Sequence, residues 1–75
     1  MIKTEDLQEL FLTRACRAGE QVTMFLMNGF QMRGKIAGFD GDVVVLDTEG
    51  RQQVIYKHAI STVVPLRPID LEEDT

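Results

Sequence analysis

The chain has 75 residues, with 12 acidic against 8 basic side chains, a net charge of −4 and 44% hydrophobic residues. This length allows one domain with a modest core, and the hydrophobic content is that of a globular protein rather than a disordered one. One cysteine excludes an internal disulfide, and the sequence has no Cys/His cluster for structural zinc. Self-association is the remaining way to stabilise so small a domain.

The negative charge is concentrated at the C-terminus. Asp70, Glu72, Glu73 and Asp74 supply four of the 12 acids, so residues 1–69 carry as many acids as bases. The body of the protein is therefore neutral, and its charge neither favours nor excludes a polyanionic partner. No apolar run approaches the roughly 18 residues of a membrane span, and the N-terminus lacks a signal-peptide pattern. We therefore expect a cytoplasmic protein with no membrane partner.

The first part of the chain has apolar residues at helical spacing. One stripe is formed by Leu7, Leu10, Phe11, Ala15 and Ala18. Gly19 follows directly, and glycine commonly ends helices. This spacing predicts a helix over about residues 5–18.

After Gly19 the apolar period changes to two, which is typical of strands. Gly34 interrupts the second of these strands and predicts a bend or bulge there. The third strand is apolar throughout, so we expect it to be buried on both faces. The turn signals are Asn28-Gly29, Asp40-Gly41 and Thr48-Glu49-Gly50. The predicted strands are 22–27, 30–39, 43–46, 52–56 and 59–64.

One helix and five short strands joined by tight turns predict a mostly-β fold. We expect an N-terminal α-helix on a strongly bent, five-stranded antiparallel sheet that forms an open barrel. The edges of an open sheet are free to pair, and Val63 and Val64 favour pairing of the last strand with a second copy. Head-to-tail pairing of this kind closes into a ring where the rotation allows it. The domain is expected to span residues 1–66, followed by a short, acidic, flexible tail at 67–75.

Three stretches of the sequence resemble a known family. They are the run from Asn28 to Gly34 (NGFQMRG), the pair Phe39-Asp40 and the run from Tyr56 to Pro65 (YKHAISTVVP). Over about residues 7–65 the chain is similar to the bacterial Hfq RNA chaperones of the Sm-like (LSm) family. The resemblance implies an Sm-like open barrel and a homohexameric ring without a cofactor. It also implies a role in binding single-stranded RNA and in pairing small regulatory RNAs with messenger RNAs, and it leaves room for RNA-processing proteins as partners.

The resemblance further implies two RNA-binding faces and a rim. The proximal face, which binds uridine-rich RNA in the family, corresponds to Gln8, Phe39, Tyr56, Lys57 and His58. The distal face, which binds A-containing, purine-rich RNA, corresponds to Phe25, Leu26, Asn28, Gly29, Phe30, Gln31, Met32, Arg33, Gln53, Ser61 and Thr62. At the rim, where the family has an arginine cluster that helps RNAs anneal, only Arg17 is in place, with Arg14 one turn earlier.

Asp42 departs from the family pattern, because many relatives have an aromatic residue at this position. An acid there removes a stacking surface and repels phosphate, so we expect proximal uridine binding to be weaker than is usual for the family. With Arg17 alone at the rim, the sequence supports RNA annealing less well than RNA binding.

Two other interpretations stay open. An Sm-like ring that serves as a structural adaptor with little RNA affinity would also fit the neutral body, Asp42 and the sparse rim. An enzyme is the weaker alternative, because no acid–base, nucleophile or metal constellation is evident and a Cys16–His58 pair lacks a third, orienting group. Phe30 and Phe39, taken alone, are residues of a kind that is found more often in a core than as a stacking platform.

Overall fold

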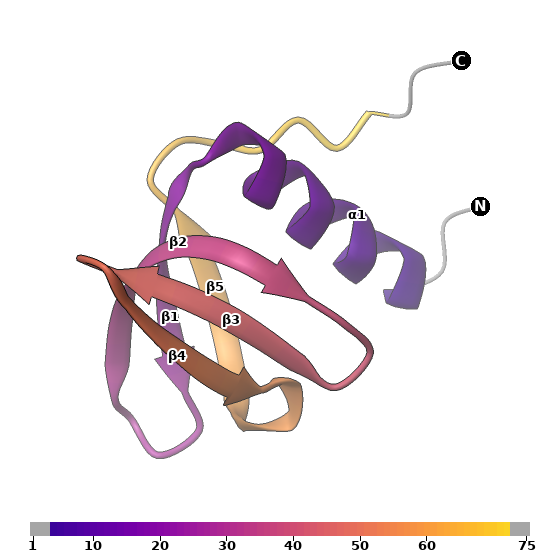
Figure 1. Cartoon of the computed structure of the whole chain (residues 1–75). Helices are drawn as coiled ribbons and strands as arrows, with labels where there is room; N and C mark the ends of the chain where they lie inside the picture. The colour runs from indigo at the N-terminus through magenta and orange to yellow at the C-terminus, as the bar shows by residue number, and fades with distance from the viewer. Residues whose placement is uncertain (1–3, 73–75) are drawn as a thin grey trace.

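The computed structural model describes residues 4–72, with side chains from residue 7 onward. One helix is followed by five strands, with a single turn of 3₁₀ helix before the last strand (Figure 1). The elements are α1 (Thr4–Ala18), β1 (Gln21–Leu26), β2 (Gln31–Phe39), β3 (Val43–Thr48), β4 (Arg51–Tyr56), η1 (Lys57–Ala59) and β5 (Ile60–Pro65). The α-helix and the five strands lie within two residues of the ranges that the sequence predicts, and η1 was not predicted.

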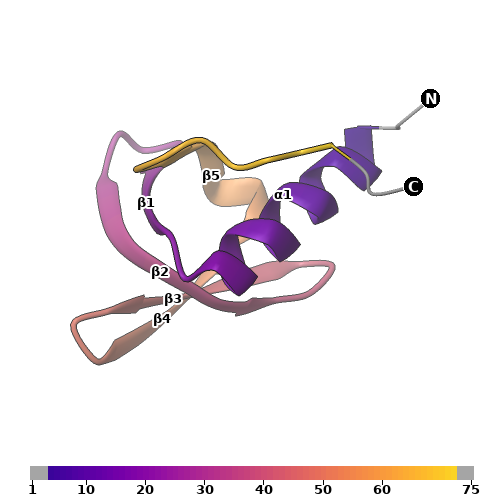
Figure 2. The same ribbon diagram turned by 90° about the horizontal axis from the view of Figure 1, so that it is seen from above.

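The strands form one antiparallel sheet in the order β4-β3-β2-β1-β5. The two edge strands, β4 and β5, are consecutive in the chain and only η1 connects them. A flat sheet of five strands would hold its edges about 19 Å apart, whereas the four Cα steps from Tyr56 to Ile60 reach at most about 14 Å. The sheet must therefore curl, and Figure 2 shows the strong curvature of β2. The predicted bent, open sheet with an N-terminal helix is confirmed.

The core lies between α1 and the concave side of the sheet. Its buried side chains are Leu12, Ala15, Val22, Met24, Ile36, Val44, Leu46 and Ile55. On α1 the buried face is centred on Leu12 and Ala15, while Leu7 and Ala18 are exposed. The predicted apolar stripe is therefore wrong at its two ends, because the sheet covers only the middle of the helix.

The end of α1 shows the hydrogen bonds of a Schellman motif. Gly19 has a φ of 62°, and its amide donates to the carbonyl of Cys16 at 3.2 Å. The next amide, of Glu20, donates to the carbonyl of Ala15 at 3.3 Å. The helix therefore ends where the sequence predicts. Over the part of the chain that the structure describes, no helix combines the length and apolar character that a membrane crossing needs.

Two expectations about the strands are corrected. In β3, Val44 and Leu46 are buried but Val43 and Val45 are only half-buried, so this strand faces the core with one side rather than both. In β2 the pairing with β3 shifts between Ile36 and Gly38, so the bulge is not at Gly34. A different contact explains Gly34: a Cβ built there would collide with the backbone carbonyl oxygen of Asp47 in β3.

The chain beyond β5 lies along α1 (Figure 2). Ile69, at the start of the predicted flexible tail, packs against the core, and Leu71 lines a cavity beside the helix. The guanidinium of Arg14 donates to the carbonyl oxygens of Asp70 at 2.8 Å and Glu72 at 2.9 Å. Residues 69–72 thus have a defined place on the domain, and the rest of the predicted tail, 73–75, lies outside the described residues.

Candidate nucleic-acid interface

The 3₁₀ turn η1 connects the two edges of the sheet and carries two of the predicted proximal residues. The amide of Lys57 donates to the carbonyl of Asp42 at 2.8 Å, and the carbonyl of Ala59 accepts the amide of Met27 at 2.8 Å. These bonds tie η1 to the β2–β3 turn on one side and to the β1–β2 turn on the other. The backbone that presents Lys57 and His58 is therefore fixed by two different parts of the sheet.

Side chains around η1 form two aromatic contacts. The Nζ atom of Lys57 lies 5.5 Å from the centre of the Phe39 ring, within the range of a cation–π contact. Tyr56 and His58 stack on each other, with ring centres 5.7 Å apart and an angle of 26° between the planes. The four side chains thus separate into a Lys57–Phe39 pair and an exposed Tyr56–His58 pair.

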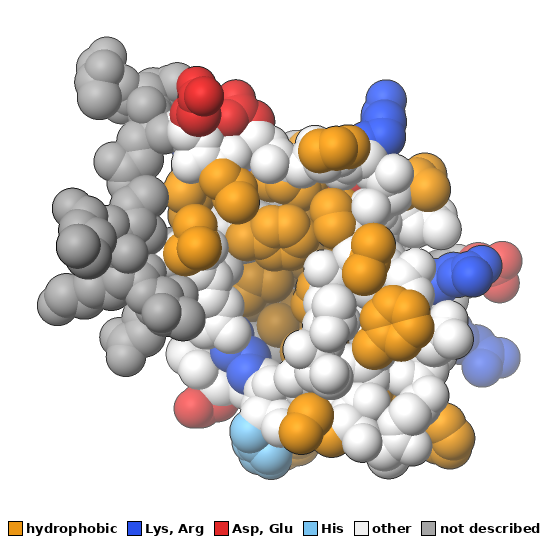
Figure 3. Space-filling model, turned by 180° about the vertical axis from the view of Figure 1, so that it is seen from behind, with side chains coloured by type: hydrophobic (Ala, Val, Ile, Leu, Met, Phe, Trp, Pro, Cys, Tyr) orange, Lys and Arg blue, Asp and Glu red, His pale blue; other side chains and the backbone are white. Residues whose placement is uncertain are grey.

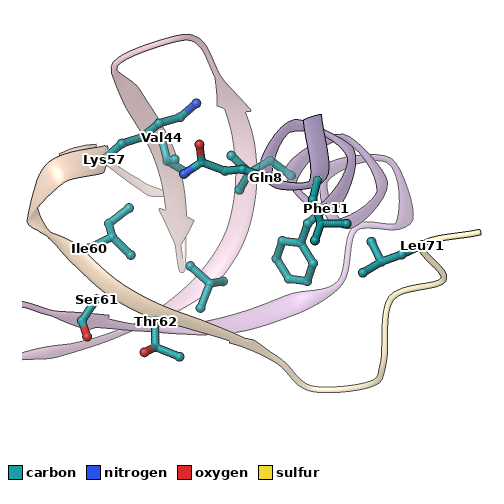
Figure 4. A pocket seen from close by; sticks show the side chains of 11 residues that line it. Gln8, Phe11, Val44, Lys57, Ile60, Ser61, Thr62 and Leu71 are labelled. Carbon is teal, nitrogen blue, oxygen red and sulfur yellow. The ribbon is translucent and has the colours of Figure 1, made fainter. Parts of the chain in front are cut away.

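A cavity of about 410 Å³ joins η1 to the helix. Gln8 of α1 and Lys57 of η1 both line it, over walls that are mostly apolar. Figure 4 shows the Gln8 side chain extending from α1 toward the side where Val44 and Lys57 lie, with Phe11 and Leu71 at the other side. In the space-filling view, apolar side chains gather around a hollow on one face of the molecule (Figure 3). The structure therefore places Gln8 and Lys57 on one cavity, and the Phe39 ring lies beneath the amino group of Lys57.

The turn between β2 and β3 supports this place and is itself acidic. One carboxylate oxygen of Asp40 accepts the amides of Asp42 at 2.8 Å and Val43 at 3.0 Å. These two hydrogen bonds, with a smaller contribution from the charge of Lys57, hold the pKa of the Asp40 carboxyl below its usual value. The Asp42 side chain is exposed, one residue beyond the turn glycine. The structure therefore exposes the Asp42 carboxylate, the group on which the expectation of weaker contact with phosphate depends.

The Asp40 turn predicts a specific acid sensitivity. Because the folded-state pKa is lowered, the charged carboxylate stabilises the fold above the usual value of 3.8, and this contribution is lost as the pH falls through 3.8 and then through the lowered value. We expect the wild-type protein to lose more stability than Asp40→Asn between about pH 6 and about pH 3, measured by urea unfolding of both proteins. The other carboxylates titrate in both proteins, so an equal loss in the two would contradict the prediction.

The predicted distal residues lie mainly on the β1–β2 hairpin. Its turn is closed by the side-chain oxygen of Asn28, which accepts the amide of Phe30 at 3.0 Å, and by the amide of Gly29, which donates to the carbonyl of Leu26 at 2.9 Å. The Phe30 side chain is 68% exposed, and Met27 beside it is 71% exposed. An aromatic ring held in water by a rigid turn is a candidate stacking platform.

Cross-strand pairs extend this surface over the convex side of the sheet. Phe25 pairs with Gln31 of β2 and with Thr62 of β5, so these three side chains form one row. Arg33 lies in the next row, opposite Thr23, and Ser61 is exposed at the β5 edge. Ser61 and Thr62 also line the cavity that Gln8 and Lys57 line, so the structure does not separate these two residues from the proximal ones (Figure 4).

Three other predicted distal residues are placed differently. Leu26 and Met32 pack against the core. Gln53 lies on β4, at the other edge of the sheet from β5. Within one chain, Gln53 therefore does not join the row formed by Phe25, Gln31 and Thr62.

At the predicted rim, Arg17 is exposed in the last turn of α1. Arg14, one turn earlier, is instead committed to the backbone carbonyls of the C-terminal segment. Sequence reasoning missed this contact and also the ion pair between Arg67 and the almost buried carboxylate of Glu20, at 3.3 Å. Both contacts join residues more than 45 positions apart, and no local sequence signal marks them.

Comparison with known proteins assigns the family. The family model described as Hfq protein matches residues 7–70. The RNA-binding protein Hfq of Moorella thermoacetica is 54% identical over 72 residues, which cover 95% of this chain and 86% of that protein. The RNA-binding protein Hfq of Geobacillus kaustophilus is 51% identical over 74 residues, 99% of both chains.

A solved structure agrees with these sequence matches. The crystal structure of the pleiotropic translational regulator Hfq superposes with a TM-score of 0.75 at 45% identity, and the match covers 77% of this chain and 97% of that one. A homohexameric ring is consistent with this family. The chain belongs to the Hfq family.

Proposed function

We propose that this protein is a ring-forming RNA chaperone that binds single-stranded RNA on two faces and helps small regulatory RNAs act on messenger RNAs. Uridine-rich RNA occupies the proximal face, around Lys57, and purine-rich RNA occupies the distal face, around Phe30. The observation that carries the proposal is that Gln8 of α1 and Lys57 of η1 line one cavity, while the Lys57 amino group lies 5.5 Å from the centre of the Phe39 ring of β2. Family membership supports it, because the matched relatives are named as RNA-binding proteins.

The chemistry of the predicted proximal residues suits a pyrimidine base. The amide of Gln8 can donate to and accept from the edge of a uracil, and the amino group of Lys57 can donate to a base carbonyl or a phosphate. The Phe39 ring offers a stacking surface once Lys57 turns toward the RNA. Each such pocket is weak, but a ring repeats it, and effective concentration then gives tight binding to a run of uridines.

The ring is formed by edge pairing in this proposal. Both edge strands are open in the single chain, and each has exposed apolar side chains, Val54 and Tyr56 on β4 and Val64 on β5. Pairing β4 of one subunit with β5 of the next covers both edges. It also brings Gln53 of one subunit toward Ser61 and Thr62 of its neighbour, which would complete the distal set.

The alternative is an adaptor ring with little RNA affinity, and the observation that favours it is the exposed acidic side chain of Asp42, whose backbone carbonyl accepts the amide of Lys57. Fluorescence anisotropy of the full-length protein with labelled oligo-U and with an A-rich purine repeat, over a salt series, separates the two. The chaperone binds both RNAs at moderate salt, with the purine repeat bound more tightly. Absence of binding to both RNAs would contradict the chaperone and support the adaptor ring.

The distal face makes a separate prediction. Phe30→Ala is expected to weaken binding of the A-rich repeat about five- to 150-fold, because stacking contributes about 1–3 kcal/mol per base. Binding of oligo-U should stay unchanged. Met27→Ala is the matched control, since Met27 is an equally exposed apolar residue in the same hairpin but is outside the distal set. An equal loss in the two variants would show that general hairpin hydrophobicity, rather than stacking on Phe30, holds the RNA.

A further inference from the structure

The C-terminal segment, residues 66–72, is held on the domain by contacts of four kinds. The amide of Leu66 donates to the carbonyl of Gln21 at 2.8 Å, and Arg67 forms the ion pair with Glu20. Ile69 then packs against the core. The two guanidinium NH₂ groups of Arg14 each donate to a different backbone carbonyl, those of Asp70 and Glu72. A planar guanidinium that bonds two carbonyls fixes both distance and orientation between α1 and the segment.

The far end of this segment reaches the proximal cavity. Leu71 lies between the two carbonyls that Arg14 holds, and it lines the same cavity as Gln8 and Lys57. Figure 4 shows Leu71 beside Phe11 of α1, across the cavity from Val44. The segment therefore contacts α1 at Arg14 and borders the cavity beside Phe11, one helical turn from Gln8.

We infer that Arg14 is a positioning residue for proximal RNA binding, which acts by clamping the C-terminal segment so that α1 holds Gln8 at a fixed distance from Lys57. This inference rests on the proposed function. The sheet buries only the middle of α1, at Leu12 and Ala15, so the first turns need a second support. The segment supplies it through Leu71 and the Arg14 clamp. Arg14 itself is turned to backbone carbonyls and does not need to touch the RNA.

The test compares two RNAs on the same protein. Arg14→Ala and Leu71→Ala are each expected to weaken oligo-U binding about three- to tenfold, the equivalent of one well-placed hydrogen bond per pocket. The affinity for the A-rich repeat, which the proposal assigns to the opposite face, should change by less than about twofold. Leu71→Ala does not change the charge, so agreement between the two variants excludes a simple electrostatic cause. Arg14→Lys, which keeps the charge and one donor, should recover part of the loss.

Lys35→Ala is the charge control, because it removes one positive charge per subunit at an exposed residue of β2 that belongs neither to a predicted RNA-binding face nor to the rim. It should leave the ratio of oligo-U to A-rich affinity as in the wild type. Hydrogen–deuterium exchange of the free protein gives an independent readout: amides of residues 7–11 should exchange faster in Arg14→Ala and Leu71→Ala than in the wild type.

An unchanged affinity ratio in both Arg14→Ala and Leu71→Ala overturns the inference. Tighter oligo-U binding by Leu71→Ala also overturns it, since the segment would then obstruct the site rather than support it. These failures are distinct from failure of the proposed function, in which the wild-type protein itself binds neither RNA.

Discussion

Gly34→Ala is expected to lower the free energy of unfolding by about 2–4 kcal/mol, the upper part of the usual cost of overpacking and beyond. The reason is the approach of β3 to β2 at the bend. A Cβ at residue 34 would collide with the carbonyl oxygen of Asp47 and would lie 2.7 Å from the hydroxyl oxygen of Thr48. Backbone on a paired strand cannot move aside as a flexible side chain does. The Thr48 hydroxyl is also engaged, because it donates to the carbonyl of Arg33 at 2.6 Å.

A change of this size is a large part of the stability of a small domain. For a chain of this length it corresponds to a fall in Tm of about 10–25 °C. Thermal and urea unfolding at one fixed protein concentration measure it, since self-association makes stability depend on concentration. Gly38→Ala is the matched control: it lies in the same strand, and a Cβ there would meet nothing within 4 Å. If the two variants unfold alike, the close approach at Gly34 does not control the fold.

Lys57→Ala is expected to weaken oligo-U binding by about tenfold to 150-fold, since a hydrogen bond to a charged group contributes about 1.5–3 kcal/mol. The substitution removes the amino group from every pocket of the ring at once. It keeps the backbone bond from residue 57 to the carbonyl of Asp42, so η1 should keep its shape. Binding of the A-rich repeat should be unaffected, because the proposal assigns that RNA to the other face. Anisotropy titrations with both RNAs give the two affinities.

Lys35→Ala is the control for the loss of one positive charge per subunit. Lys35 is exposed on β2 and belongs to neither predicted face. If only the loss of charge mattered, Lys57→Ala and Lys35→Ala would lose the same amount of oligo-U affinity. Both would also show the same reduction in the salt dependence of that affinity. The proposal requires a much larger loss in Lys57→Ala than in Lys35→Ala, and equal losses would count against a specific proximal site.

The order and type of the elements could be predicted because local signals agree in this chain. The helical stripe ends at Gly19, the apolar period then changes to two, and glycine-containing turns separate the first four strands. What local signals could not give is the environment that strands acquire from their neighbours. Val43 and Val45 appear as apolar as Val44, and only the position of β3 in the curled sheet leaves them half-buried.

The same limit applies to the candidate site. The residues around η1 could be singled out because the Tyr-Lys-His block resembles the family, and their roles in RNA binding stay predictions. The contact of Lys57 with Phe39 and the clamp of Arg14 on the C-terminal segment depend on side chains that approach only after the whole sheet has curled. Gly34 was singled out as a bend or bulge; the bulge lies instead between Ile36 and Gly38, and the close approach of β3 to Gly34 has no local signal because it depends on the tertiary fold.

The shortness of η1 has a mechanical consequence. Three residues connect the two edges of the sheet, and two of those residues, Lys57 and His58, are the ones proposed to hold RNA. The segment proposed to hold RNA is thus also the short link between the two edges along which neighbouring subunits would pair. In a closed ring the curvature of each subunit must match that of the others, so a change of curvature in one subunit has to be shared by its neighbours. RNA bound at one η1 would therefore be sensed at the neighbouring ones through geometry alone.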